Sequence, residues 1–193
     1  MARPREFDET AALDAAVACF WQRGYEATSV RDLAGKMGIS APSLYNAYGD
    51  KHALFVQALE RYLDRSMRAR IRRLEESLPP KQAVYRFIEE IIAHSLNDQE
   101  RRGCFLINSA LEVAPHDRKL GALIAERLAE IQAFFHRSIK AAQAQGEVPR
   151  DRGAKDLARL LLGIVLGIRV LARAKPERTL LEGIARPALA LLD

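Results

Sequence analysis

The side chain best suited to covalent chemistry in this sequence is Cys104, which follows two arginines and a glycine. A neighbouring cation and a helix N-terminus each favour the thiolate, the form that reacts with oxidants and electrophiles. Arg101 and Arg102 supply the cations, so the segment predicts a reactive cysteine at the start of a helix. The alternative is a small core residue, because burial beside Phe105 would oppose the charged form.

Other residues of the carboxy-terminal half could surround a small molecule together with Cys104. Asn108 falls one turn further along and could present a polar group to the same cavity or bond a neighbouring helix. Arg169 interrupts an otherwise apolar segment, where it could hold an effector carboxylate or form an ion pair across a subunit interface. Four residues could form apolar walls, with ordinary core packing as the alternative for each: Phe87, Ile91, Phe134 and Phe135.

No spacing in the chain is typical of a metal site or a catalytic centre. The two cysteines, Cys19 and Cys104, lack the Cys-x-x-Cys pattern of metal ligands. His94 and His136 could line the cavity, but no His, Asp and Glu residues have a metal-ligand spacing. A phosphate-binding glycine loop, paired carboxylates and a Cys/His signature are also missing. We therefore expect no metal, no cofactor and no enzymatic activity.

A second set of small and polar residues could read DNA. A helix-turn-helix needs a short support helix, a sharp turn and a second short helix whose first turns enter the major groove. Residues 28–48 have these dimensions, and apolar side chains can pack the two helices together: Leu33, Ala34, Ile39 and Leu44. Small and polar residues then remain available around the second helix: Ser40, Ala41, Ser43, Tyr45 and Asn46.

Helix periodicity and helix-ending residues dominate the whole sequence. Asp8, Thr28 or Ser29, Ser40 and Asp50 can cap helices, and glycines and prolines supply the breaks between them. Alternating β-branched stretches are absent, so the predicted fold class is all-α. We expect about nine helices, over residues 9–23, 30–37, 41–47, 51–78, 82–97, 102–113, 117–145, 154–174 and 177–192.

The charge of the chain does not by itself indicate nucleic-acid binding. The net charge of +5 is uneven, and Arg61, Arg65, Arg68 and Arg72 form one helically spaced row that is most simply a solvated face. The longest strongly apolar run, residues 160–168, is far shorter than the ~18 residues that span a bilayer. We expect a cytoplasmic protein with no membrane segment.

Three strings near the amino terminus carry a family resemblance. Residues 24–34 read Gly-Tyr-Glu-Ala-Thr-Ser-Val-Arg-Asp-Leu-Ala, residues 38–45 read Gly-Ile-Ser-Ala-Pro-Ser-Leu-Tyr, and residues 48–51 read Tyr-Gly-Asp-Lys, with Leu54 following. In order and spacing they resemble the amino-terminal signature of TetR-type repressors. Residues 102–104 resemble the helix start of a branch that includes the N-ethylmaleimide-responsive repressor.

The resemblance implies roles for individual residues on DNA. Thr28 would place its hydroxyl and a helix N-terminus against a phosphate. Tyr45 and Lys51 would hold the phosphate backbone, although Tyr45 could instead pack on the neighbouring helix. Tyr48 would also contact DNA, although the family usually has His-Phe or Tyr-Phe where this chain has Ala47-Tyr48. Base-edge or nearby groove contacts would come from Arg31, Ser40, Ala41, Pro42, Ser43 and Asn46, with an ion pair to Asp32 or Asp50 as the alternative for Arg31.

The resemblance also implies the organisation of the chain. A helix-turn-helix domain over residues 1–52 would precede an effector-binding and dimerisation domain over residues 53–193. Two copies would bind double-stranded operator DNA as a homodimeric repressor, released by a small-molecule or electrophile effector. The apolar faces of segments 154–174 and 177–192 suit a four-helix interface between subunits, with a monomer's own core as the alternative.

Overall fold

The computed structural model describes residues 7–193, which contain helices and no strand. The first three helices are α1 (Glu9–Arg23), α2 (Val30–Met37) and α3 (Ala41–Tyr48). Each begins at a side-chain cap that the sequence predicted. Asp8 accepts from two backbone N–H groups of α1, Ser29 and Asp32 form a capping box on α2, and Ser40 accepts from the N–H of Ser43 on α3.

A long rod follows, in which α4 (Lys51–Leu63), a π-helical turn η1 (Asp64–Arg68) and α5 (Ala69–Ser77) run on without a break. The sequence predicted one regular helix here, capped by Asp50. The cap is confirmed, but the π turn was not predicted. The Ser66 hydroxyl donates to the carbonyl of Tyr62 at 2.6 Å. Short π segments are rare and occur most often at functional sites.

The remaining helices agree with the prediction except at their ends. Their bounds are α6 (Pro80–Asn97), α7 (Phe105–Glu112), α8 (Arg118–Ala144), α9 (Ala154–Ala174) and α10 (Arg178–Leu189), which continues as a 3₁₀ turn, η2 (Ala190–Leu192). Helix α6 begins at Pro80, earlier than predicted, because proline fits the first turn of a helix. With the rod counted as one helix, residues 7–193 form the nine helices that we expected.

Helix α7 is shorter than predicted, and this changes the position of Cys104. The backbone φ angles are +52° at Arg101 and +72° at Gly103, so a helix cannot start there. The N–H of Gly103 donates to the Asp98 carboxylate at 2.8 Å, which fixes the turn. A Cβ at position 103 would lie 2.7 Å from the Arg173 side chain, which together with the positive φ favours glycine here. Cys104 is therefore the N-cap of α7 and not part of its first turn.

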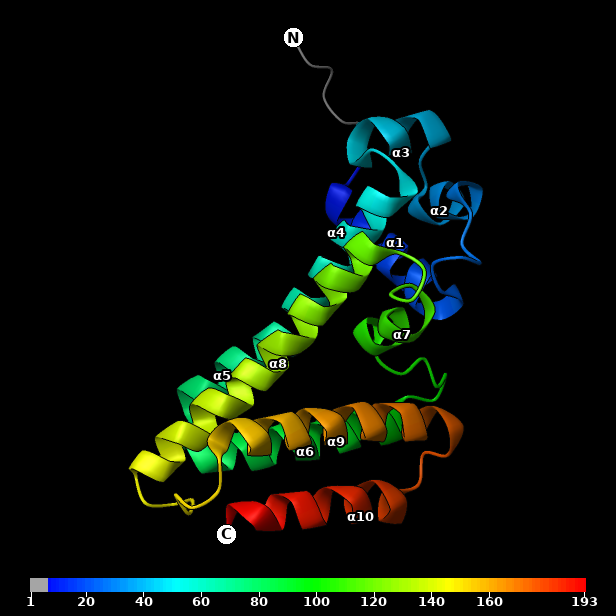
Figure 1. Ribbon diagram of the computed structural model, residues 1–193. Coiled ribbons are helices and arrows are strands. Elements are labelled where there is room, and N and C mark those ends of the chain that lie inside the picture. Colours follow the sequence, from blue (N-terminus) through cyan, green and yellow to red (C-terminus); the bar gives the residue numbers. More distant parts are fainter. Residues whose placement is uncertain (1–6) are drawn as a thin grey trace.

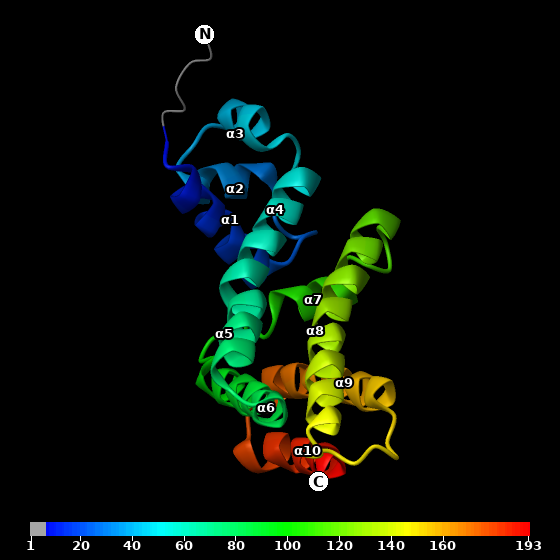
Figure 2. The same ribbon diagram turned by 90° about the vertical axis from the view of Figure 1, so that its left-hand side faces the viewer.

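Helices α1–α3 form one end of the molecule, and α6, α9 and α10 form the other (Figure 1). The rod and α8 connect the two ends, and α7 lies between them, as the rotated view shows (Figure 2). At the first end, α1 packs on α4, where the rings of Phe20 and Phe55 meet edge to face at 5.2 Å. Leu54 and Phe55 of α4 are fully buried, so the start of the rod completes the core of the three-helix unit.

Ion pairs link the rod to α8. Arg68 bonds Glu130 and Glu60, each at 2.7 Å, and Arg127 bonds Glu60 at 2.6 Å and Glu130 at 3.1 Å. Arg61 and Arg65 both pair with Asp14 of α1. The interpretation of the arginine row as a solvated face was therefore wrong for these three arginines, because carboxylates on other helices meet them.

The ion pairs of Glu130 predict a pH dependence of stability. The hydrogen bond from Arg68, against an opposing effect of burial, lowers the pKa of Glu130 below the ordinary glutamate value of 4.5. Because the pKa is depressed in the folded state, the stabilisation is present above pH 4.5 and is lost as the pH falls through the folded value. We expect Glu130→Gln to have a lower free energy of unfolding than the parent near neutral pH, at about pH 6 for example. The difference in unfolding free energy between the two proteins should become smaller in strong acid.

Urea unfolding across the acid range measures this difference. The matched control is Glu126→Gln, since Glu126 lies on the same helix and its side chain is 71% exposed. An unfolding free energy that falls equally steeply in the parent and in Glu130→Gln would contradict the prediction.

Candidate nucleic-acid interface and effector cavity

Helix α3 presents most of the predicted DNA-reading residues to solvent. Tyr45 is 51% exposed, and Pro42 and Asn46 are exposed, whereas Leu44 on the opposite face is fully buried. The hydroxyls of Ser40 and Ser43 lie 2.8 Å apart at the start of the helix, with Ala41 half-buried beside them. The helix lies at the extremity of the molecule, away from the carboxy-terminal helices (Figure 1). Such a placement leaves its first turns free to enter a groove.

Two of the predicted DNA contacts are wrong in this structure. Thr28 is fully buried and its hydroxyl donates to the carbonyl of Gly24 at 2.6 Å, so the group predicted to meet a phosphate is already engaged. The exposed residue at the start of α2 is its cap, Ser29. Tyr48 is also buried and its hydroxyl donates to the carbonyl of Glu9. Thr28 thus closes the turn between α1 and α2, and Tyr48 ties α3 to the first residue of α1.

Arg31 and Lys51 lie beside that face. Arg31 is exposed, and neither of the carboxylates considered as its partner bonds it: Asp32 pairs with Arg23 at 3.0 Å, and Asp50 caps α4. The Nζ atom of Lys51 lies 4.3 Å from the ring centroid of Tyr25, which holds this cation at the start of α4.

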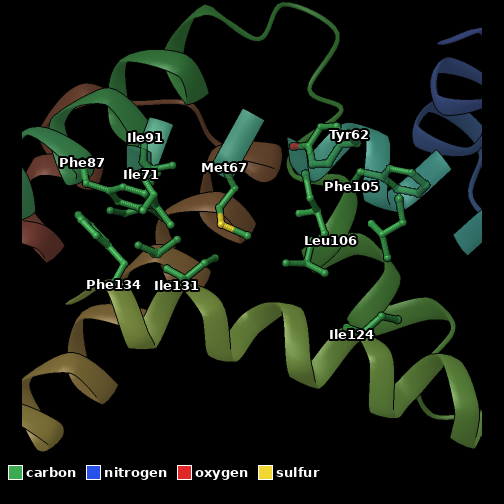
Figure 3. Packing of buried hydrophobic residues seen from close by; sticks show 14 of the residues in the cluster. Tyr62, Met67, Ile71, Phe87, Ile91, Phe105, Leu106, Ile124, Ile131 and Phe134 are labelled. Carbon is green, nitrogen blue, oxygen red and sulfur yellow. The ribbon is translucent and has the colours of Figure 1, made fainter. Parts of the chain in front are cut away.

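A cavity of about 260 Å³ lies where the DNA-reading end meets the carboxy-terminal helices. Its lining residues come from α1, the rod, α6, α7, α8 and α9, and the π turn contributes Ser66 and Met67. Met67 lies between two groups of apolar side chains, one around Phe87 and Ile91 and the other around Tyr62 and Leu106 (Figure 3). Asp14, Val17 and Trp21 of α1 also line the cavity, so one wall belongs to the DNA-reading end.

Half of the predicted effector residues line this cavity: Cys104, Phe87, Ile91 and Arg169. Phe134 and Phe135 do not, because both rings pack behind Phe87 with centroids at 5.2 Å. Phe105 is a core residue between Phe55 and Tyr62. Tyr62, Met67 and Arg70 also line the cavity, although their helical positions indicated only a core or solvent face.

Asn108 does not face the cavity, so its predicted role there is wrong. Its Nδ2 donates to the carbonyl of Arg102 at 2.7 Å, and its Oδ1 accepts from the guanidinium of Arg173 on α9 at 3.1 Å. The helix-to-helix hydrogen bond that we considered as the alternative is therefore the one observed.

The polar contact of the Cys104 thiol is the hydroxyl of Tyr62, which donates to Sγ at 3.7 Å. Burial raises the pKa of Tyr62, so the hydroxyl keeps its proton and remains a donor. The guanidinium of Arg102 lies 4.3 Å from the ring centroid of Trp21, and Arg101 is exposed. A tyrosine that the sequence did not single out is thus the partner of the thiol.

The other end of α7 contacts the end of α1. The carboxylate of Glu112 accepts from the N–H of Glu26 at 3.0 Å. A Cβ on Gly24, whose φ is +86°, would lie 2.5 Å from the same carboxylate. Because Cys104 caps one end of α7 and Glu112 closes the other, this helix joins the cavity directly to the turn between α1 and α2.

Comparisons with known proteins decide the family. The sequence profile described as "Bacterial regulatory proteins, tetR family" matches residues 12–58, and the profile described as "Tetracyclin repressor-like, C-terminal domain" matches residues 80–187. The chain belongs to the TetR family. Members of this family are transcriptional regulators that bind DNA, and homodimers and ligand response are typical of them.

Individual relatives cover the whole length of this TetR-family chain. The HTH-type transcriptional regulator YezE of Bacillus subtilis is 33% identical over 195 residues, with 100% of each chain covered. The HTH-type transcriptional repressor ComR of Escherichia coli is 32% identical and covers 98% of this chain and 90% of its own. A cysteine variant of the TetR family regulator CifR, solved with a 26-bp operator duplex, superposes with a TM-score of 0.88 at 30% identity, with both chains fully covered.

Two further searches concern membranes and metals. Among the helices of residues 7–193, none is long and apolar enough to cross a bilayer. Within the same part of the chain, no group of three or more His, Cys, Asp or Glu side chains is arranged to hold a metal ion.

The geometry of α3 and α4 predicts different effects for two substitutions on DNA binding. Asn46→Ala, on the exposed face of α3, is expected to change base preference at a cost of ~1–3 kcal/mol on the preferred duplex. Lys51→Ala is expected to lower the affinity for every duplex by a similar factor. It should also reduce the slope of log K against log salt concentration by about 1, because one phosphate contact is lost.

Fluorescence anisotropy with a set of single-base operator variants measures both effects. Lys140→Ala removes one exposed cation from the far end of α8 and is the control for net charge. A change of base preference in Lys51→Ala would show that the two roles are assigned incorrectly.

Proposed function

We propose that this chain is a homodimeric repressor that binds a two-fold symmetric operator through α3 and releases it when the cavity is filled. The exposed face of α3 at the extremity of the molecule is the observation on which the DNA-binding part depends. The repressor name of ComR and the operator complex of CifR support the same function. Because its target is chromosomal DNA, we place the protein in the cytoplasm, and we assign it no enzymatic activity.

The chain divides by role near residue 52. Residues 1–52 would carry the DNA-reading unit, of which positions 1–6 lie outside the described residues, and residues 53–193 would carry the cavity and the subunit interface. Helix α4 belongs to both, since its first turns complete the core of the reading unit and its last turn lines the cavity. A ligand in the cavity would therefore contact the rod and α1 at once.

The subunit interface would be formed by α9 and α10. Large apolar side chains of α9 and η2 stay exposed in the single subunit, with Leu160 at 40%, Val170 at 45% and Leu171 at 37% on α9 and Leu191 at 36% on η2. Gly163 and Gly167 lie on the same face of α9 as Leu160 and Leu171, and space is open around Gly163, so a second helix could approach closely. Two apolar helices from each subunit form a four-helix interface of the usual kind.

This interface predicts that Leu171→Glu converts the dimer to a monomer. A buried charge without a partner at the two-fold axis opposes association, and a monomer contacts only one half-site, so operator affinity falls at least tenfold, on the order of 1.4 kcal/mol or more. Sedimentation and anisotropy measure the two losses. Leu111→Glu is the control, because Leu111 on α7 is 65% exposed and lies outside α9 and α10. A dimer that persists in Leu171→Glu would contradict the interface.

Release of the operator could be driven by an electrophile at Cys104. The thiol is half-buried in the cavity wall, whereas Cys19 is only 3% exposed in α1. The hydroxyl of Tyr62 can donate to a developing thiolate, which favours the reactive form. An added group on Sγ would occupy the cavity beside Trp21 and Tyr62 and displace α7 relative to α1.

The test is alkylation with limiting N-ethylmaleimide, followed by peptide mapping and operator titration. We expect Cys104 to be labelled before Cys19 and operator affinity to fall at least tenfold with labelling, on the order of 1.4 kcal/mol. Cys104→Ser should bind the operator like the parent and lose the response. Equal labelling of both thiols, or a Cys104→Ser protein that still responds, would exclude Cys104 as the sensor.

A further inference from the structure

Arg169 of α9 is a buried cation without a carboxylate. It is 5% exposed in the single subunit, and its Nη1 donates to the hydroxyl of Ser95 on α6 at 3.2 Å. No ion pair joins it to an Asp or Glu within residues 7–193. The burial within one subunit removes the alternative of an ion pair across the dimer interface. The side chain lines the cavity instead.

The charges around Arg169 increase the positive potential at this end of the cavity. Arg70 lines the same wall, with its guanidinium carbon 5.8 Å from the ring centroid of Phe87. Its Nε bonds Glu90 at 3.1 Å, but Glu90 also bonds Arg73 at 2.6 Å, so one carboxylate serves two cations. Partial burial, together with the positive charges of Arg169 and Arg70, lowers the pKa of His94.

The one carboxylate among the described lining residues is already occupied. Asp14, from α1, pairs with both Arg61 and Arg65. The lining thus holds four arginines and one carboxylate, and Arg169 alone of the four has no ion pair with an Asp or Glu of the described residues. A buried cation that lacks a counter-charge is unfavourable, and an anion that enters the cavity removes that cost.

Much of the remaining lining is apolar. Phe87, Ile91, Ile131 and Val165 line the same cavity as Arg169. Met67 lies between the group around Phe87 and the group around Tyr62 (Figure 3). A strongly hydrated inorganic anion gains nothing from such walls. A planar guanidinium matches the two oxygens of a carboxylate, and apolar surface matches a hydrocarbon body.

We propose that the cavity binds a small organic acid, with its carboxylate on Arg169 and its apolar body against Phe87 and Ile91. The inference rests on the proposed function, because it assigns a chemical class to the reversible effector of the same cavity. A neutral electrophile that reacts at Cys104 and an acid that binds at Arg169 would then enter one cavity and act on different walls.

The test measures binding to the free, full-length protein, so it does not depend on operator DNA. The probes are benzoate, phenylacetate and hexanoate, each compared with its primary amide and with inorganic phosphate, in thermal shift and calorimetry. At least one carboxylate should raise the Tm and bind about tenfold or more tightly than its amide. Carboxylates no better than amides, or phosphate equal to the carboxylates, would overturn the proposal.

Substitution of Arg169 provides the second readout. Arg169→Met should abolish the preference for acid over amide and should raise the Tm of the ligand-free protein, because an unpaired buried charge is replaced by an apolar chain. A merely structural arginine would instead lower the Tm when removed. If Arg169→Met folds poorly, Arg169→Lys tests the site instead, because lysine keeps the positive charge but lacks the planar guanidinium. Arg169→Lys should bind the acid more weakly than the parent.

Arg159→Met is the matched control, since Arg159 lies on the same helix, is exposed, pairs with Asp156 of that helix and stays outside this cavity. It should leave carboxylate binding unchanged. Carboxylate binding that survives in Arg169→Met and Arg169→Lys would overturn the assignment, whereas a failure of operator binding in the parent would count against the proposed function alone.

Discussion

Tyr62 occupies the point where the DNA-reading end, the rod and α7 meet. Its ring packs edge to face on Trp21 of α1 at 5.0 Å and on Phe105 of α7 at 5.6 Å, while its hydroxyl reaches the Cys104 thiol. Each aromatic pair contributes ~0.5–1.5 kcal/mol beyond the area it buries. Since the same ring lines the cavity, a change in the cavity reaches α1 through one side chain. Helix α7 offers a second connection, because Glu112 closes its other end on Glu26.

The cavity combines features that a fold selected only for stability would lack. Arg169 is buried without a counter-charge, η1 interrupts the α-helical hydrogen bonding of the rod, and a cavity of about 260 Å³ lies beside them. Locally unfavourable features concentrate at sites where a ligand or a second conformation repays them. Their coincidence at the junction of the two ends is consistent with a site whose occupancy changes the position of α1 relative to α9.

The helices could be predicted because their signals are local. Asp8, Ser29, Ser40 and Asp50 cap their helices as expected, since a cap depends on a few consecutive residues. The cavity could not be predicted in the same way, because helical periodicity shows which face is buried but not which buried residue meets a void. Phe134 and Phe87 therefore looked equally suited to line a cavity. The contact between Tyr62 and Cys104 could not be predicted either, because it joins residues far apart in the chain.

We infer that the cavity and the DNA-reading end are mechanically coupled through α7. The most direct test is amide hydrogen exchange, measured before and after reaction with N-ethylmaleimide. The protein used is Cys19→Ser, in which Cys104 is the one remaining thiol. We predict that alkylation changes exchange in α7 and also in residues 21–28, where α1 ends and Glu26 bonds Glu112, with α10 unchanged. Changes confined to α6–α9, with residues 21–28 unaffected, would contradict the account.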